Sequence, residues 1–197
     1  MQLHDFPLSG NCYKVRLFLG LIGQRAEIVT VNLAAGEQKQ PAFLALNPRG
    51  QVPVLVEDGQ ALVDSQAILV YLARRHAPDW LPDDALQQGR IASWLSFAAN
   101  ELHHGPASAR VIKLFRRPGD LEATQAKARQ VLAVVELQLG SHAWLAEGAA
   151  PSIADVALYP YLALAEEGGV ELAPYPHIRQ WCNRIRALPG YVELPRL

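Results

Sequence analysis

The first part of the chain alternates between two hydrophobic periods. Apolar and polar residues alternate at residues 3–6 and again at residues 26–33, which predicts two short strands. Between them, apolar residues recur at helical spacing from Val15 to Ile22, and Gly23 is placed to end that helix. The pattern therefore predicts a strand, a helix and a second strand, in that order.

The next segment predicts a hairpin between two helical stretches. Residues 41–47 are typical of one or two helical turns, and residues 52–63 of two strands joined by a tight turn at Asp58 and Gly59. A helix over residues 65–76 follows, with two arginines in its last turn. A right-handed crossover makes the first two strands parallel, and the hairpin adds an antiparallel pair. We therefore expect an α/β domain in which helices cover a small mixed sheet.

The composition changes at residues 77–84, where two prolines and three aspartates are typical of a linker. Beyond the linker the periodicity is helical and predicts no strand. Helices are expected over residues 88–107, 121–139, 152–167 and 175–188. The predicted organisation is an α/β domain over residues 1–77, a linker over residues 78–84 and an all-helical domain over residues 85–197.

Composition narrows the class of protein. Of the 197 residues, 50% are hydrophobic and 19% charged, so the chain can bury a core. The net charge of −1 gives no indication of a nucleic-acid or anionic membrane partner. No apolar run approaches the roughly 20 residues of a membrane-spanning helix, and the first residues do not resemble a signal peptide. Two distant cysteines, Cys12 and Cys182, form no disulfide framework, so we expect a cytoplasmic protein.

The start of the first helix carries the clearest candidate chemistry. Ser9 and Cys12 stand in the spacing of a Cys-x-x-Cys redox motif, with serine in the first place. A helix N-terminus favours a thiolate, and a serine hydroxyl and the Asn11 amide suit a thiolate supplied by a ligand. The alternative is that Ser9 only caps the helix. For Cys12, a small semi-buried residue is favoured over a resolving thiol, because no second cysteine is placed to pair with it.

Two further segments have a binding and a structural interpretation. A cis bond before Pro53 would turn the Val52 backbone amide toward a ligand, but the base rate for X–Pro bonds predicts trans. Asp64 and Ser65 precede a helix. They either cap that helix or bind the ammonium and carboxylate groups of an amino acid. In a polar loop, Gln38 and Lys39 would bind a second carboxylate of the ligand, or would simply be solvated.

Ser152 and Asp155 form a capping box that is expected to start a core helix.

The adjacent His103 and His104 point about 100° apart on a helix, whereas helical metal sites place two histidines four residues apart. We therefore expect no metal.

These motifs resemble those of the cytosolic glutathione transferases, in particular bacterial serine-type members that are Nu-like or Zeta/Theta-like. The resemblance runs from about His4 to Pro189. It is carried by three segments, LSGNCYKVRLFL at residues 8–19, NPRGQVPVLVEDGQALVDSQAILVYLA at residues 47–73 and PSIADVALYPYLA at residues 151–163. It implies a thioredoxin-like N-terminal domain, an all-helical C-terminal domain, glutathione as co-substrate and a homodimer.

The resemblance also implies roles for individual residues. Ser9 and Asn11 would donate to the glutathione thiolate, the Val52 backbone before Pro53 would pair with the cysteinyl part, and Asp64 with Ser65 would hold the γ-glutamyl end. The glycyl carboxylate would lie near Gln38, Lys39 and Gln51. A second substrate, between the two domains, would contact Phe6, Leu8, His104 and Arg110. Ser152 and Asp155 match the folding signature of the helical domain.

The implied function is a detoxifying glutathione transferase, in which the thiolate attacks a small hydrophobic electrophile. Members resembling maleylacetoacetate isomerase usually carry Ser-Ser-Cys where this chain has Ser9, Gly10 and Asn11, which weakens the isomerase interpretation. Beta-type members use a cysteine that stands earlier than Cys12. Two alternatives stay open, a glutathione-dependent disulfide reductase and a non-catalytic binding or regulatory module of the same fold.

Overall fold

A computed structural model describes residues 1–194. The chain forms two compact units. The first unit consists of Met1–Ala77 together with the segment that starts at Pro189, and the second consists of Pro78–Leu188. None of the helices in the described residues is long and apolar enough to cross a membrane.

The first unit contains a four-stranded mixed sheet with helices on both faces. Its elements are β1 (Gln2–Asp5), α1 (Gly10–Leu21), β2 (Glu27–Thr30), η1 (Glu37–Lys39), α2 (Pro41–Leu46), β3 (Val54–Glu57), β4 (Gln60–Val63) and α3 (Ser65–His76). The strand order is β2-β1-β3-β4, with β1 parallel to β2 and antiparallel to β3. The predicted hairpin is confirmed, because β3 and β4 pair antiparallel with Glu57 opposite Gln60.

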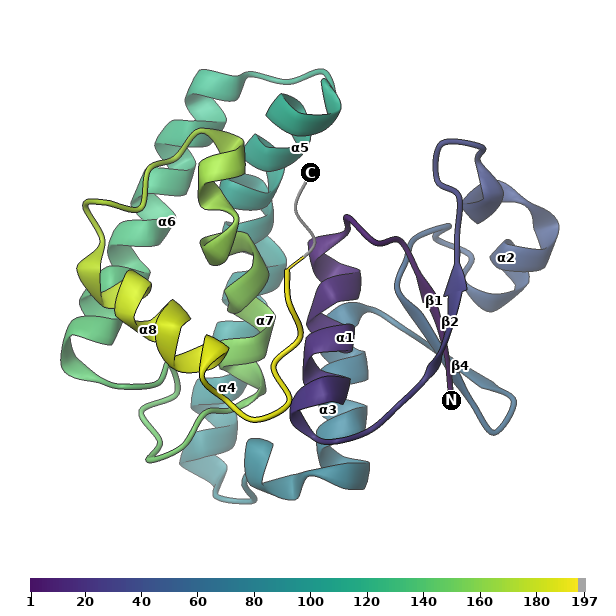
Figure 1. Cartoon of the computed structure of the whole chain (residues 1–197), viewed down its shortest axis with the longest axis horizontal. Helices are drawn as coiled ribbons and strands as arrows, with labels where there is room; N and C mark the ends of the chain where they lie inside the picture. The colour runs from purple at the N-terminus through teal and green to yellow at the C-terminus, as the bar shows by residue number, and fades with distance from the viewer. Residues whose placement is uncertain (195–197) are drawn as a thin grey trace. The chain divides into compact units, whose positions relative to one another are not determined.

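The two faces of this sheet bury different helices. The pair α1 and α3 lies side by side on one face and α2 lies on the other (Figure 1). On the α2 side, Phe43 packs with Val31 and Val54. The helices α1 and α3 bury Val15, Phe18, Ile68, Leu69 and Leu72. Each such side chain stabilises the fold by about 1.5–3 kcal/mol relative to an exposed one, so this packing holds both helices against the sheet.

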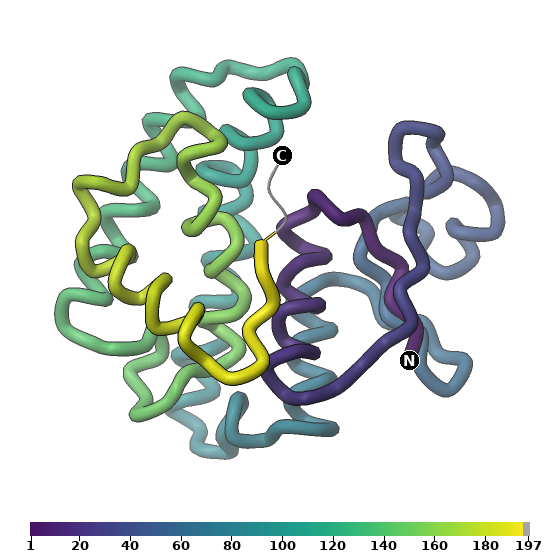
Figure 2. Tube along the Cα trace, viewed as in Figure 1, coloured from purple at the N-terminus to yellow at the C-terminus, as the bar shows by residue number. Residues whose placement is uncertain are grey.

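The C-terminal segment returns to α1 (Figure 2). The Tyr13 hydroxyl donates to the Val192 carbonyl at 2.5 Å. Gly20 allows the backbones to touch, because a Cβ there would lie 2.5 Å from the Gly190 carbonyl oxygen. The expectation of one helical domain over residues 85–197 therefore differs from the structure at its end. A return that depends on one tyrosine and two glycines leaves no periodic pattern in the sequence.

The second unit is helical, and its residues 78–188 contain no strand. Its elements are η2 (Pro78–Trp80), α4 (Ala85–Phe97), η3 (Ala98–Ala107), α5 (Ser108–Phe115), α6 (Leu121–Ser141), α7 (Ile153–Ala163), η4 (Ala165–Gly168) and α8 (Pro176–Arg186). The first of these, η2, is a short turn within the predicted linker.

The helix predicted over residues 88–107 is formed by α4 and the π-helical segment η3, which ends at Ala107. Gly105 leaves helical geometry at φ −103° and ψ −107°, and Pro106 follows it, so the chain kinks between two helices here. The helix α5 then ends at Phe115. The helix predicted over residues 152–167 is also divided, because α7 ends at Ala163 and η4 follows.

The predicted capping box at α7 is confirmed. The Ser152 hydroxyl accepts from the Ala154 N–H, and Asp155 accepts from the Ser152 N–H at 2.9 Å. Asp155, only 1% exposed, also accepts from the Leu145 N–H at 3.1 Å and the Trp181 Nε1–H at 2.8 Å. One carboxylate therefore joins the loop before α7 to α8 within this unit.

Candidate functional site

Ser9 is the N-cap of α1. Its backbone is extended, at φ −75° and ψ 123°, and its hydroxyl oxygen accepts from the Cys12 N–H at 3.2 Å. This is the capping role that the sequence left open. The bond uses a lone pair of the oxygen, so the hydroxyl hydrogen stays available to a ligand at a helix N-terminus that carries partial positive charge. Capping and ligand binding are therefore compatible at Ser9.

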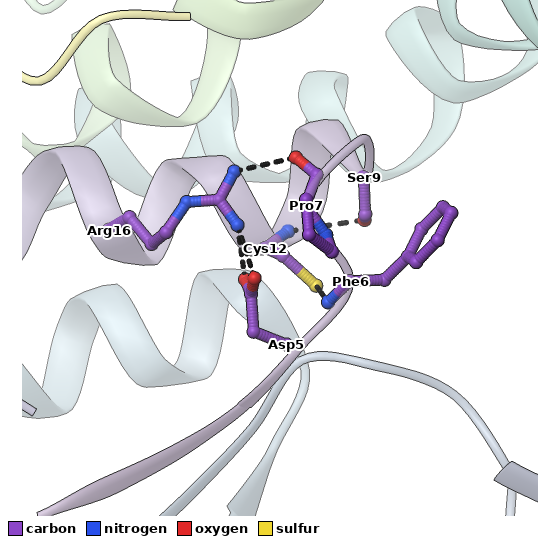
Figure 3. Close-up of polar contacts among 6 residues, drawn as sticks. All are labelled: Asp5, Phe6, Pro7, Ser9, Cys12 and Arg16. Atoms are coloured by element: carbon purple, nitrogen blue, oxygen red, sulfur yellow. Dashed lines mark hydrogen bonds and ion pairs between the residues drawn. The ribbon is translucent and has the colours of Figure 1, made fainter. Parts of the chain in front are cut away.

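The loop that presents Ser9 is held to α1 by side chains from β1 and α1 (Figure 3). Both carboxylate oxygens of Asp5 accept from Arg16 Nη1 at 2.5 Å, and Arg16 Nη2 donates to the Pro7 carbonyl at 2.7 Å. The Phe6 N–H donates to the Cys12 sulfur at 3.4 Å. Burial raises the pKa of Asp5, and the Arg16 guanidinium opposes this shift. These bonds fix the chain immediately before the cap.

Cys12 is a buried residue, in agreement with the favoured interpretation. It has no exposed surface, and burial raises the pKa of its thiol to about 12. Cys182 is buried in the second unit, and burial raises its pKa to about 12 as well. Both are free thiols that stay protonated at neutral pH. Neither is in a state to act as a redox nucleophile.

Asp64 and Ser65 bring the start of α3 next to the start of α1. Asp64 caps α3, its Oδ1 accepting from the N–H groups of Gln66 at 2.9 Å and Ala67 at 3.2 Å. The Ser65 hydroxyl donates to the Gln66 side-chain oxygen at 2.5 Å and lies 3.3 Å from the Asn11 carboxamide oxygen. Asp64 is exposed, so its second oxygen is accessible to a ligand while the first caps the helix.

Lys14 belongs to this site and was missed by the sequence analysis. It is 1% exposed, and its amine donates to the Asn11 carboxamide oxygen at 2.9 Å. Burial lowers the pKa of Lys14 to about 7, with Asp64 opposing the shift. A lysine within an amphipathic run normally faces solvent. The one signal available was its spacing of three from Asn11, which places both side chains on the same face of a helix.

The loop between α2 and β3 is shaped by Asn47, a buried residue. Its amide donates to the Gln51 carbonyl at 2.7 Å, and its oxygen accepts from the Arg49 N–H at 3.1 Å. The Val52–Pro53 bond that follows is cis, so the base-rate prediction of trans is wrong. A base rate averages over all surroundings and says nothing of a particular loop.

Gly50 lets this loop approach η1. Its φ is 61°, and a Cβ there would lie 2.8 Å from both the Gln38 carbonyl oxygen and the Lys39 amine. The predicted carboxylate-binding residues Gln38, Lys39 and Gln51 therefore lie on two touching loops. The Gln38 amide donates to the Leu33 carbonyl at 3.4 Å, and the Lys39 amine reaches the Arg49 carbonyl at 3.5 Å.

The four expected substrate contacts divide between the two units. Phe6 and Leu8 lie in the loop before Ser9, whereas His104 and Arg110 belong to η3 and α5. His104 is exposed and packs edge-on against His103, with 5.0 Å between the two ring centroids. Arg110 is buried, donates to Glu167 at 2.6 Å and lies over the Phe115 ring. The geometry of Arg110 therefore favours a structural role over the expected substrate contact.

No group of three or more histidine, cysteine, aspartate or glutamate side chains within residues 1–194 is arranged to hold a metal ion.

Comparison with protein families gives two matches. Residues 3–80 match the family described as the glutathione S-transferase N-terminal domain, and residues 118–184 match its C-terminal domain. The chain belongs to the glutathione S-transferase family. The predicted fold, a thioredoxin-like domain followed by a helical domain, is confirmed.

Similar proteins cover nearly the whole transferase chain. It is 36% identical to a maleylacetoacetate isomerase of Pseudomonas aeruginosa, over 97% of this chain and 93% of that protein. It is also 36% identical to glutathione S-transferase 3 of Zea mays, over 97% and 91% of the two chains. A solved glutathione S-transferase from Pseudomonas fluorescens has 34% identity and a TM-score of 0.93, covering 99% of this chain and 98% of that one. These likenesses support an enzyme with glutathione transferase function.

Proposed function

We propose that the first unit binds glutathione and that Ser9 donates its hydroxyl hydrogen to the glutathione sulfur. The observation that carries this proposal is the position of Ser9. It caps α1 through its oxygen, a bond that does not use its hydroxyl hydrogen, and it lies at the positive end of the helix. The Asn11 amide nitrogen supplies a second donor from the first turn of the same helix.

Two donors and a helix N-terminus favour the ionised form of the bound thiol. An ordinary thiol has a pKa of about 8.5, so most of it is protonated at neutral pH. Lowering the pKa by about two units corresponds to about 2.7 kcal/mol of preference for the thiolate. The thiolate is the nucleophile in thiol chemistry, and this shift is therefore the catalytic contribution that we assign to Ser9 and Asn11.

The remaining binding residues orient glutathione along the unit. Asp64 offers a carboxylate to the α-amino group of the γ-glutamyl residue, next to Ser65 at the start of α3. The Val52 backbone, before Pro53, pairs with the cysteinyl part. The glycyl carboxylate lies near Lys39, with the Gln38 and Gln51 amides beside it. These assignments follow the family resemblance, and the proximity of the loops that carry them supports it.

The reaction that we assign is nucleophilic attack on a small hydrophobic electrophile. The glutathione sulfur forms a bond to the electrophilic carbon, and the leaving group departs with its electron pair. Phe6, Leu8 and His104 are the side chains that we expect to contact this substrate. Detoxification is the corresponding role.

The second candidate is a glutathione-dependent disulfide reductase. The burial of Cys12 favours one version of it, in which every exchanging thiol comes from glutathione or from the substrate. The non-catalytic alternative is weakened by the joint presence of Ser9, Asp64 and Ser65 in one unit. We place the protein in the cytoplasm, because both cysteines are free. A homodimer without nucleic-acid or membrane partners stays a prediction from the resemblance and the near-zero charge.

Thermal unfolding with and without glutathione, repeated with an S-alkyl glutathione, tests the proposal. A ligand at 100 times its dissociation constant stabilises the folded state by about 2.7 kcal/mol, which raises the melting temperature measurably. A rise with both ligands supports the site, and no rise at millimolar glutathione contradicts it. Initial rates with an aromatic halide and with a small disulfide then separate conjugation from disulfide reduction.

A further inference from the structure

A lysine lies buried beneath the two donors of the proposed site. Lys14 stands on α1 with its side chain almost fully enclosed, and its amine donates to the Asn11 carboxamide oxygen at 2.9 Å. Burying an amine is costly, because its hydration is lost and only a few protein groups replace the water. A hydrophobic residue would fill the same space without that cost. The presence of lysine here therefore calls for a role beyond packing.

The contact with Lys14 determines which end of the Asn11 carboxamide faces inward. An ammonium group has donors only, so the atom next to it must be the carboxamide oxygen. The Ser65 hydroxyl also lies 3.3 Å from that oxygen. The single hydrogen of that hydroxyl has a closer acceptor in the Gln66 side-chain oxygen at 2.5 Å, so Lys14 is the donor that holds the oxygen of Asn11. The amide nitrogen of Asn11 is left as the end that a ligand can reach. Asn11 itself is partly exposed.

We propose that Lys14 is a positioning residue of the glutathione site, which holds the oxygen of Asn11 inward so that the amide nitrogen of Asn11 is presented to the sulfur. The inference rests on the proposed function, in which Asn11 donates to the glutathione sulfur. It extends that function to a residue that need not touch glutathione. A freely rotating carboxamide would offer its oxygen as often as its nitrogen, and an oxygen facing a thiolate is repulsive.

The charges around Lys14 are consistent with this role at neutral pH. Burial lowers the pKa of Lys14 to about 7, and the Asp64 carboxylate at the start of α3 opposes the shift. Asn11 and Ser65, the other polar groups described beside it, do not titrate in this range. The amine carries N–H groups in both its protonated and its neutral form. It can therefore donate to Asn11 on either side of its pKa.

The test compares Lys14→Met with wild type. Methionine has a similar length and no donor, so the helix can stay packed while the hold on Asn11 is lost. The thiol pKa of bound glutathione is read from thiolate absorbance in the ultraviolet over a pH series. We expect K14M to keep glutathione affinity within about threefold and to raise the thiol pKa by about one unit, which slows conjugation about tenfold below that pKa. The matched control is Lys127→Met, a partly exposed lysine of α6 in the other unit that pairs with Glu101, which should change neither quantity.

A double-mutant cycle separates positioning from a merely structural role. In an Asn11→Ala background, K14M should add no further rise in the thiol pKa, because the group that Lys14 holds is gone. Asn11→Asp covers the case in which K14M does not fold. It keeps an oxygen for Lys14 but has no donor, so the thiol pKa should rise at least as much as in K14M.

Three outcomes overturn the inference. An unchanged thiol pKa in a folded K14M would do so, and so would an unchanged thiol pKa in Asn11→Asp. A K14M effect of full size in the Asn11→Ala background would show that Lys14 does not act through Asn11. Wild-type protein that fails to bind glutathione overturns the proposed function itself, and this is measured first, so the two failures are distinguishable.

Discussion

The Ser9 hydroxyl oxygen accepts a hydrogen bond from the Cys12 N–H at 3.2 Å, and the two side chains of this redox-like spacing have opposite surroundings. Cys12 is fully buried, with its sulfur accepting from the Phe6 N–H, whereas Ser9 is partly exposed at the helix start. The position that a redox protein gives to its reactive cysteine is thus held by a hydroxyl. A hydroxyl there can bind a sulfur from a ligand without being oxidised itself.

Cys12 should be chemically silent in the folded protein. Because burial raises the pKa of its thiol to about 12, the thiolate is scarce at neutral pH. We expect neither cysteine to react with a thiol reagent until denaturant is added. Cys12→Ala should retain transferase and disulfide reductase activity within about twofold, after correction for the stability lost with a buried sulfur. Loss of disulfide reductase activity in a stably folded Cys12→Ala would contradict this account.

Asp64 is expected to contribute charge to glutathione binding and a cap to α3. Asp64→Asn keeps an oxygen for the Gln66 and Ala67 N–H groups and tolerates the positive φ of 77°, but it loses the charge. Its glutathione affinity should fall about 10- to 100-fold, the loss of one charged hydrogen bond, with little change in melting temperature. Asp64→Ala should lose affinity and stability together. Unchanged affinity in Asp64→Asn, measured by calorimetry, would leave only the capping role.

Asp155 should be essential to stability and irrelevant to glutathione chemistry. Asp155→Ala leaves the Leu145 N–H, the Ser152 N–H and the Trp181 indole N–H without their acceptor. Each buried unpaired donor costs about 1–3 kcal/mol, so denaturant titration should show a loss of about 3 kcal/mol or more. Asp155→Asn keeps one acceptor oxygen and should lose less. Equal stability of Asp155→Ala and wild type would contradict the network.

Lys14 should make the free energy of unfolding depend on pH. Its pKa is lowered to about 7 in the folded protein from a model-compound value of 10.5, so between these values the unfolded state binds more protons. Stability therefore rises with pH across this window, by up to about 1.4 kcal/mol per pH unit. Urea titrations at pH 7 and pH 9 should show this gain in wild type relative to Lys14→Met. A parallel pH dependence in the two proteins would mean that Lys14 titrates normally.

Local patterns predicted the first unit well, because its elements are short and follow each other closely. The alternation at β1 and β2, the hairpin turn at Asp58 and the caps at Ser9 and Asp64 are all properties of neighbouring residues. The capping box at Ser152 belongs to the same class. Each of these depends on residues within a few positions of each other, which a single sequence displays.

The features that the sequence analysis missed depend mainly on contacts between residues far apart in the sequence. The cis bond before Pro53 runs against the base rate for X–Pro bonds, and the burial of Lys14 involves Asn11 on α1 and Asp64 at the start of α3. The helix α5, which follows the kink at Gly105, was not among the predicted helices, and Gly105 lies against Ala128 of α6. Arg110 was placed with the substrate, but its ion pair with the distant Glu167 is invisible in the sequence.

The measurement that tests the central claim most directly is the thiol pKa of glutathione bound to wild type and to Ser9→Ala, read from thiolate absorbance over a pH series. Ser9→Thr serves as the control, since threonine keeps both the hydroxyl and the cap. We expect wild type and Ser9→Thr to hold the thiol pKa about two units below its value of about 8.5 in solution. Ser9→Ala should return it most of the way while glutathione affinity changes little. A bound thiol pKa in wild type equal to that of free glutathione, or an unchanged lowered value in Ser9→Ala, would contradict the assignment of Ser9.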